Sequence, residues 1–397
     1  MTHRSPSDPT LLTIGTCNRR AGIATTVESF TRFHPPANAF VCLADRPTKD
    51  MPPLDIPATV FYADELPLPG GRRFLFKYDA FELCCALKPF AIARVMEKQH
   101  VNRLLYLDSD ILVLNPFWQD LEVAWSEHSV LLTPHVVQPP SRMPLEFQRS
   151  LAQHGAYNGG CIAIRMDEQS RSFLSCWSDL VARLCLLDPM NSLYVDQRWL
   201  DLLAASSAGV GVLRDPGLNV AYWNLHERRL SIDDGGNWSV NGRPLKFFHF
   251  SGFDQERLTT KASCADPLAL QLAEHYGRAL EEAHDQEFRN REYGWARYAD
   301  GRIIERSHRD LILSECADLA DIADPFALPD VIGWKKLEDL ARSNEPVRIS
   351  ERYHEREHSA PTLRRLRRHP VIGTVWKLWE RFVNPSLSAD DPAHGRF

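Results

Sequence analysis

Two aspartates interrupt an apolar stretch near residue 108. Leu104–Leu107 is apolar and runs into Asp108–Asp110, after which Ile111–Leu114 is apolar again. A charged side chain in such a segment costs free energy unless it is paired or binds a metal. Two carboxylates at positions i and i+2 of a strand end can face one hard cation once the strand bends, and Mg²⁺ or Mn²⁺ prefers such oxygen ligands. The pattern predicts a strand that ends in a cation site, although an acid pair capping a turn is the alternative.

Short apolar runs alternate with helix-like stretches in the first half of the chain. Leu11–Gly15 predicts a strand followed by a loop and a helix, and Ala39–Ala44 predicts a second strand that ends at Asp45. Apolar residues recur at helical spacing over 78–99, where Pro89 should start a new helix or kink the existing one. This alternation favours an α/β sheet with parallel strands, whose ligands bind at the carboxyl ends of the strands.

Later segments divide the chain into three expected parts. Further strands are predicted at 129–133, 160–165, 211–213 and 246–250, helices at 168–187 and 196–205, and a hairpin at 238–244. Beyond residue 254 the pattern becomes mainly helical, and beyond 345 charged residues dominate. We therefore expect a main domain over 10–260, a helical accessory region over 261–345 and a charged tail over 346–397.

Composition narrows the class of partner and the compartment. With 397 residues, 44% of them apolar, the chain can bury a sizeable core, and a net charge of −6 provides no general attraction for a nucleic acid, so none is expected as a partner. The nine cysteines include no CxxC pair, which indicates reduced and mostly buried thiols. The first residues do not resemble a signal peptide, and the chain has no run of 18 apolar residues, so we expect a cytoplasmic protein.

Four segments together resemble the family 8-like nucleotide-sugar transferases of GT-A type. Leu104–Asp110 resembles the YLDxD strand of that family, Tyr157–Ile164 its FNSG segment, Leu193–Leu200 its DQ helix start, and Phe247–Gly252 its late HxxG element. The motifs follow the order of the family within residues 10–255 and are specific as a set. The resemblance implies an α/β fold with a GT-A Rossmann-like mixed sheet flanked by helices, and a mainly helical C-terminal extension.

The resemblance also implies a set of site residues. Asp108, Asp110 and His249 would hold Mn²⁺ or Mg²⁺, which neutralises a departing diphosphate. Asp196 and Gln197 would contact the sugar at the reacting face. The remaining donor contacts would come from strand ends and the glycine segment, namely Thr16, Cys17, Asn18, Asp45, Ser109, Asn158, Gly159 and Gly160. Structural interpretations stay open for several of them: a core histidine, a glycine turn, or a helix N-cap at Asp196.

One departure from the family concerns the diphosphate. The family's late motif continues from its glycine to a lysine, whereas Ser251–Gln255 supplies none. Lys88, just before the metal strand, is the first candidate for the missing cation, and a solvated helix lysine is the alternative interpretation. The other candidates are Arg72, Arg73 and Lys261.

The expected activity is that of a glycosyltransferase. The resemblance implies a metal-dependent hexosyltransferase that moves a sugar from a nucleoside-diphosphate donor, UDP by family likeness, to a glycan, lipid-linked or other acceptor with retention. A nucleotidyltransferase is one alternative, but its Gly-rich phosphate loop is poorly matched by Gly15–Gly22, which has two arginines and few glycines. A non-catalytic binding or scaffold protein is the other, and the intact Asp108 and Asp110 argue against it.

Two segments beyond the main domain carry their own patterns. Tyr293–Ile304 resembles a segment that follows the transferase domain in some bacterial glycosyltransferases, and is either accessory and acceptor-facing or an aromatic packing element. Arg364–His369 is basic and precedes a stretch, 371–383, in which Trp376 and Trp379 recur at helical spacing. Such a basic amphipathic segment suits peripheral contact with the anionic inner face of a membrane. A helix docked on the protein itself or on another subunit is the alternative.

Deleting residues from 361 onward tests the membrane interpretation. Six Lys or Arg residues and one acid lie within 361–383, and each basic residue near an anionic bilayer contributes about 1 kcal/mol of attraction. We expect the truncated chain to keep its turnover of soluble donor but to lose salt-sensitive co-sedimentation with anionic vesicles. A truncated chain that unfolds or changes its oligomeric state would show a packing segment instead.

Overall fold

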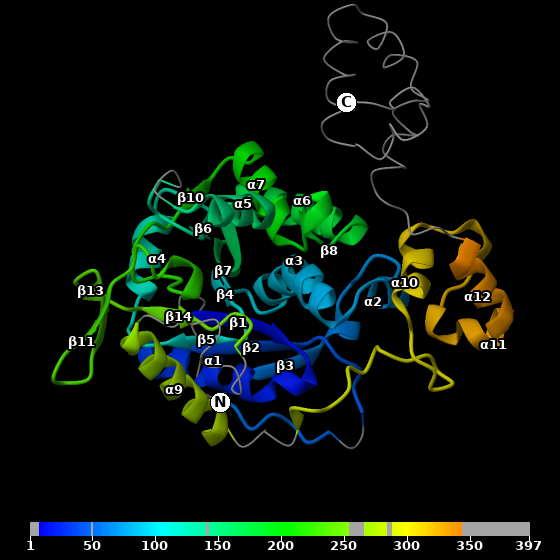
Figure 1. The fold of residues 1–397 in the computed structure, drawn as a ribbon, viewed down its shortest axis with the longest axis horizontal. Helices are drawn as coiled ribbons and strands as arrows, with labels where there is room; N and C mark the ends of the chain where they lie inside the picture. The colour runs from blue at the N-terminus through cyan, green and yellow to red at the C-terminus, as the bar shows by residue number, and fades with distance from the viewer. Residues whose placement is uncertain (1–7, 49–50, 140–142, 254–265, 284–287, 344–397) are drawn as a thin grey trace, which may run out of the picture. The chain divides into compact units, whose positions relative to one another are not determined.

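A seven-stranded sheet forms the centre of the fold (Figure 1). The computed structural model describes residues 8–48, 51–139, 143–253, 266–283 and 288–343. The sheet has the order β10-β6-β7-β4-β1-β2-β3, built from β1 (Thr10–Gly15), β2 (Asn38–Leu43), β3 (Thr59–Tyr62), β4 (Arg103–Leu107), β6 (Val130–Pro134), β7 (Tyr157–Arg165) and β10 (Val210–Val212). Only β7 runs antiparallel to its neighbours in this sheet. The mixed α/β sheet implied by the family resemblance is confirmed, and the parallel strands that the alternation favours are present in β1, β2, β3 and β4.

Helices cover both faces of the sheet, which explains why β1 and β2 are buried at every residue. α1 (Arg20–Phe33) and α3 (Ala80–Lys98) both contact β1 and lie on opposite faces (Figure 1). α6 (Glu168–Arg183) packs on α3, and α9 (Pro267–Glu282) packs on α1. α4 (Trp118–Trp125) and α7 (Gln197–Ser206) contact β7 near the other edge.

α3 continues through its proline. Asp79 caps the helix by accepting a hydrogen bond from the Glu82 amide, and Pro89 lies inside the helix with its side chain buried. Of the two outcomes expected at Pro89, the start of a new helix does not occur. The reason is tertiary, because the buried residues of α3 contact β1, β4 and α6, and this packing offsets the hydrogen bond that proline cannot donate.

The chain leaves the central sheet at Asp108. β5 (Ile111–Val113) does not continue β4 but pairs antiparallel with β14 (Phe247–His249) in a separate two-stranded sheet. The ladder places His249 opposite Ile111, and the Phe250 amide donates to the Asp110 carbonyl at 2.8 Å. The apolar stretch that the two acids interrupt therefore forms two strands of two sheets, and the acid pair forms the turn between them.

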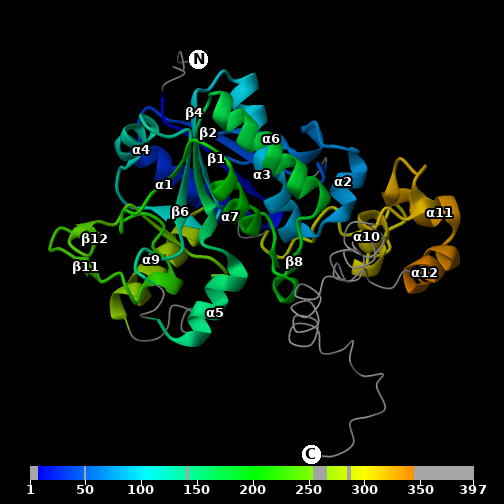
Figure 2. The same cartoon turned by 90° about the horizontal axis from the view of Figure 1, so that it is seen from above.

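The C-terminal region is mainly helical, as expected. It contains α10 (Arg306–Leu313), α11 (Leu328–Ile332) and α12 (Trp334–Ser343), and α10 packs beside α2 (Arg72–Lys77) (Figures 1 and 2). One compact unit of the chain extends to Asp339. The expected domain boundaries stay predictions, and Lys261 and the tail with its basic segment lie outside the described residues.

Smaller elements complete the described fold. The expected hairpin is present as β12 (Trp238–Val240) and β13 (Arg243–Pro244), joined by β11 (Leu230–Ile232). β8 (Leu187–Asp188) and β9 (Leu193–Tyr194) form a short pair near α5 (Leu145–His154). β3, α2 and α5 were not predicted, because short or half-exposed elements have weak periodicity. Within the described ranges, every helix is too short or too polar to span a bilayer.

Replacing Gly22 by alanine tests the contact between α1 and the acid turn. A Cβ at Gly22 would lie 2.5 Å from the Ser109 carbonyl oxygen, which belongs to the backbone. Alanine in an open helix is more favourable than glycine by about 1 kcal/mol, but here we expect Gly22→Ala to lower the free energy of unfolding by about 1–3 kcal/mol through overpacking. Urea unfolding measures the difference. A variant more stable than the wild type would contradict the contact.

Candidate active site

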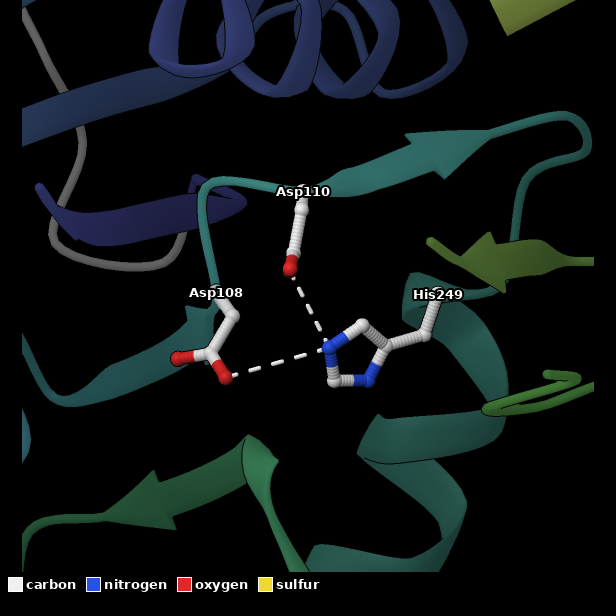
Figure 3. Close-up of side chains that lie close together, drawn as sticks. All are labelled: Asp108, Asp110 and His249. Atoms are coloured by element: carbon white, nitrogen blue, oxygen red, sulfur yellow. Dashed lines mark ion pairs between the residues drawn. The ribbon is translucent and has the colours of Figure 1, made fainter. Parts of the chain in front are cut away.

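Three predicted metal ligands lie together at the acid turn (Figure 3). Asp108 and Asp110 come from the turn between β4 and β5, and His249 ends β14, so two sheets supply them. One ligand atom from each residue lies within 4.8 Å of the others. The His249 Nε2 is 3.0 Å from Asp110 Oδ1 and 3.9 Å from Asp108 Oδ2. Asp110 Oδ1 is buried and accepts no hydrogen bond of good geometry, so the residues fit a divalent cation.

The charges of this cluster are interdependent. Burial opposes the charged form of both Asp110 and His249, but the imidazole lowers the pKa of Asp110, and Asp110 and Asp108 raise the pKa of His249. The acid pair thus creates a strongly negative position at the imidazole nitrogen. A divalent cation bound here would take the place of that proton, which is the usual competition at a metal site.

Asn219 orients the histidine. The His249 Nδ1 lies 3.2 Å from Asn219 Oδ1, while the amide nitrogen of Asn219 donates to Thr133 Oγ1 at 3.2 Å. The Asn219 oxygen therefore keeps a proton on Nδ1, which leaves Nε2 as the ring nitrogen that faces the acids and that would bind a metal. Asn219 is fully buried with a φ of 51°, a left-handed conformation that asparagine adopts more readily than most residues. No sequence pattern marked this residue.

Lys88 and Asp196 form a second charged pair beside the metal ligands. The Lys88 ammonium lies 3.1 Å from Asp196 Oδ2 and 3.5 Å from Asp108 Oδ1, and it donates to the Gly159 carbonyl at 2.9 Å. Burial lowers the pKa of Lys88, but Asp108 and Asp196 outweigh burial and raise it well above its ordinary value. The Tyr106 hydroxyl also donates to Asp108, at 2.6 Å. Lys88 is therefore a buried and fully charged cation that already has partners.

A bulge in β7 brings the glycine segment to the acids. The register between β6 and β7 shifts after Leu132, which opposes Ile162, so that Thr133 opposes Asn158 and the residues between bulge out. A Cβ at Gly160 would lie 2.5 Å from His249 Cε1, so glycine is required for this approach. The bulge thereby places the Gly159 and Gly160 backbone beside the metal ligands.

Gln197 holds this segment in place. Its side-chain oxygen accepts from the Gly159 amide at 3.0 Å and lies 3.3 Å from the Asn158 amide nitrogen, while its own amide nitrogen donates to the His154 carbonyl at 2.7 Å. Asp196, predicted to be a helix N-cap in the structural interpretation, makes no side-chain capping bond. The neighbouring Asp196 carboxylate instead faces Lys88.

A cavity of about 160 Å³ collects these residues. Of the predicted site residues its wall includes Lys88, Asp108, Asn158, Gly159, Gly160, Asp196, Gln197 and His249. Aromatic side chains that sequence reasoning missed line the rest of the wall, among them Phe81, His135, Phe147, Tyr194, Tyr222 and Trp223. They come from helices and loops spread over more than 140 residues of sequence, which no local pattern connects. The site thus combines charged and aromatic side chains.

The predicted nucleoside residues lie at the ends of β1 and β2, and are not among the residues that line this cavity. Cys17 is fully buried, and Asp45 is nearly so. Ser109 lies beside the end of β1, with its hydroxyl 3.3 Å from the position of a Cβ at Gly15. The roles of Thr16, Cys17, Asn18, Asp45 and Ser109 stay predictions.

Arg19 adds an exposed cation at the same edge. It follows β1 directly, and its positive charge contributes to the lowered pKa of Asp110. Its side chain makes no hydrogen bond or ion pair with any residue that the structure describes. Sequence reasoning could have found Arg19, because it is the first basic residue after the first predicted strand.

Comparisons with known proteins show partial likeness. No family model matches the chain. It is 27% identical over 179 residues to the uncharacterized protein YfnF of Bacillus subtilis, and 26% identical over 178 residues to YfnD of the same organism. These matches cover 44% and 43% of this chain, and 58% and 54% of the two relatives. The chain therefore spans little more than half the length of these curated relatives.

The solved structures that the chain resembles are glycosyltransferases. They include the galactosyltransferase LgtC in complex with donor and acceptor sugar analogs, at a TM-score of 0.41 and 15% identity, over 69% of this chain and 95% of LgtC. GlyE of Streptococcus pneumoniae has a TM-score of 0.39 at 13% identity, over 71% of this chain and 64% of GlyE. Mouse xyloside xylosyltransferase 1 has a TM-score of 0.38 at 11% identity, over 61% and 97%. Likeness at these TM-scores and identities concerns the fold, and the function depends on the residues of the site.

The buried His135 predicts how stability depends on pH. Burial lowers its pKa from 6.5 to about 4, and its Nδ1 lies 2.9 Å from the Gly155 carbonyl. The unfolded chain binds a proton near pH 6.5 and the folded chain only near pH 4, so stability falls as the pH drops through this window, by up to about 3 kcal/mol. Urea unfolding across this range should show a weaker pH dependence for His135→Gln. Identical profiles for the two proteins would contradict a neutral buried His135.

Proposed function

We propose that this chain is a metal-dependent glycosyltransferase that transfers a sugar from a nucleoside-diphosphate donor, UDP by family likeness, to a glycan or lipid-linked acceptor with retention. The observation that carries the proposal is the convergence of Asp108, Asp110 and His249, because Asp108 and His249 line a cavity that also contains the Lys88–Asp196 pair. Burying two carboxylates beside an imidazole costs free energy unless a cation binds them.

The cation would act on the leaving group. Mn²⁺ or Mg²⁺ held by Asp108, Asp110 and His249 would supply positive charge to a diphosphate as it departs. The protein's part is to keep the ligands in place, through the Asn219 bond to His249 and the Tyr106 bond to Asp108. Both partners fix their ligand before a substrate arrives, which lowers the cost of reorganisation during the reaction.

The charge balance of the site favours an additional cation for the diphosphate. The positive charges of a divalent ion and Lys88 together equal the negative charges of Asp108, Asp110 and Asp196. No net positive charge then remains to bind the diphosphate of the substrate. Lys88 also has its ammonium held by two carboxylates and a carbonyl. The exposed guanidinium of Arg19 can bind phosphate oxygens in pairs. We therefore add Arg19 to Lys88 as a candidate for binding the diphosphate.

Asp196 and Gln197 are proposed to hold the sugar. Asp196 is 1% exposed, lines the cavity and is fixed by Lys88. Gln197 is fixed at both ends of its amide by Gly159 and His154. A carboxylate and an amide with fixed orientations suit recognition of sugar hydroxyls, because buried polar partners reject a ligand that lacks a matching group. The aromatic side chains that line the same cavity would face the acceptor.

Substituting the acid pair tests the metal assignment. We expect Asp108→Asn and Asp110→Asn each to lower Mn²⁺-dependent hydrolysis of a UDP-sugar by about 100-fold or more, with little change in urea unfolding. Asp179→Asn, at an exposed position on α6, is the matched control and should retain wild-type turnover. Full activity in both site variants would exclude the metal role, and donor binding without turnover in the wild type would favour a non-catalytic protein.

His249→Ala separates a metal ligand from a core histidine. With one ligand lost, we expect more Mn²⁺ to be required for half-maximal hydrolysis, and a smaller thermal shift on adding Mn²⁺ with UDP. A metal titration that matches the wild type would return His249 to a packing role. A panel of nucleotide-sugars in the same thermal-shift assay identifies the donor.

A further inference from the structure

Asp45 joins the ends of two strands to a distant segment. It follows β2, and its Oδ2 accepts a hydrogen bond from the Cys17 amide, just after β1, at 3.0 Å. Its Oδ1 accepts from the Arg46 amide at 2.9 Å and from the Gly294 amide at 2.6 Å. Gly294 lies 249 residues further along the chain. The carboxylate therefore connects the predicted nucleoside edge to the accessory region, and backbone donors already surround it.

Glycine is required at position 294. A Cβ there would lie 2.4 Å from Asp45 Oδ1, 2.9 Å from Arg46 Cβ and 3.0 Å from the Arg46 amide nitrogen. Two of these three atoms belong to the rigid core of residue 46, so the neighbours cannot rotate away. Any larger residue must push the segment off the carboxylate and break the bond between Gly294 and Asp45.

Contacts on both sides hold this segment against the end of β2. Before the glycine, Arg291 donates to Thr48 Oγ1 at 2.9 Å. After it, the ring of Trp295, which is 1% exposed, lies under the Arg46 guanidinium at 4.7 Å. The Trp295 carbonyl accepts from Arg309 at 2.9 Å, and Arg309 is itself bonded to the backbone of residues 76 and 78. Contacts on both sides of Gly294 therefore hold this segment in place, in addition to the bond from Gly294 itself.

We infer that Gly294 is a positioning residue of the donor site, which acts through Asp45 to set the residues that hold the nucleoside. The inference rests on the proposed function. Asp45 follows β2, which lies two strands from β4 and the metal ligands, a separation of about 10 Å at the usual strand spacing. Gly294 thus belongs to the nucleoside half of the site and not to the metal half.

This assignment also gives Tyr293–Ile304 a role. Trp295 and Tyr298 are buried, so the segment does not present these rings to an acceptor. Its backbone instead reaches the strand ends where a nucleotide is expected. The helical region behind it would then be required for donor binding even though it contributes no metal ligand among the described residues.

Gly294→Ala is the test, with UDP and inorganic pyrophosphate as probes in the presence of Mn²⁺. Isothermal titration of the full chain should show at least a tenfold loss of UDP affinity and a clearly smaller loss of pyrophosphate affinity, because pyrophosphate makes no contact with the nucleoside residues that Asp45 positions. Hydrogen exchange at the Cys17 amide should become faster. Arg297→Ala, in the same segment but paired with the exposed Glu292, is the matched control and should leave both probes unaffected.

Each result is decisive. UDP affinity equal to the wild type overturns the inference, and so does an equal loss for UDP and pyrophosphate, which would mean general disruption. If Gly294→Ala does not fold, Arg291→Ala replaces it, because it removes only the bond to Thr48, and a selective loss of UDP affinity is again required. A wild type that binds pyrophosphate with Mn²⁺ but not UDP refutes the nucleoside role while leaving the metal site intact. A wild type that binds neither refutes the proposed function.

Discussion

The departure of the chain from the central sheet at Asp108 is the constraint on which the site depends. If β4 continued as one strand, Asp108 and Asp110 would stay in the main sheet between β7 and β1, and the β5–β14 pair would not form. Because β5 instead pairs with β14, the register that sets His249 opposite Ile111 also sets its imidazole 3.0 Å from Asp110. The backbone hydrogen bonds between β5 and β14 thus offset the free energy needed to bring Asp108, Asp110 and His249 together out of water.

Burial of charge then determines what else the site must contain. Asp196 and Asp108 line the same cavity, and the Lys88 ammonium from α3 lies 3.1 Å from Asp196 and 3.5 Å from Asp108, which offsets their repulsion. Lys88 lies directly before Pro89 in α3, which runs unbroken through the proline. Burial raises the pKa of Asp196, and the neighbouring Lys88 opposes this rise, so Lys88 favours the charged form of the carboxylate.

The region after the main sheet is joined to it by specific polar contacts. Arg309 donates to three backbone carbonyls, and Arg306 forms a pair with Glu82 at the start of α3. Guanidinium groups suit this role because their planar donors satisfy several carbonyls at once. These contacts hold the accessory helices against the residues around α3. The bond from Gly294 to Asp45 adds a contact just after β2.

The sequence alone determined the chemistry of the site and the order of its parts. The apolar run before Asp108 and Asp110, the glycine pair at 159 and 160, and His249 within an aromatic strand each marked a strand end, since local hydrophobic patterns record which residues must be buried. Tertiary structure alone decided which of these ends meet. The antiparallel direction of β7, the β5–β14 pair, the bond from Asn219 to His249 and the bond from Gly294 to Asp45 all join residues far apart in the chain. Such contacts depend on packing and register across the whole fold, and a local pattern contains no information about them.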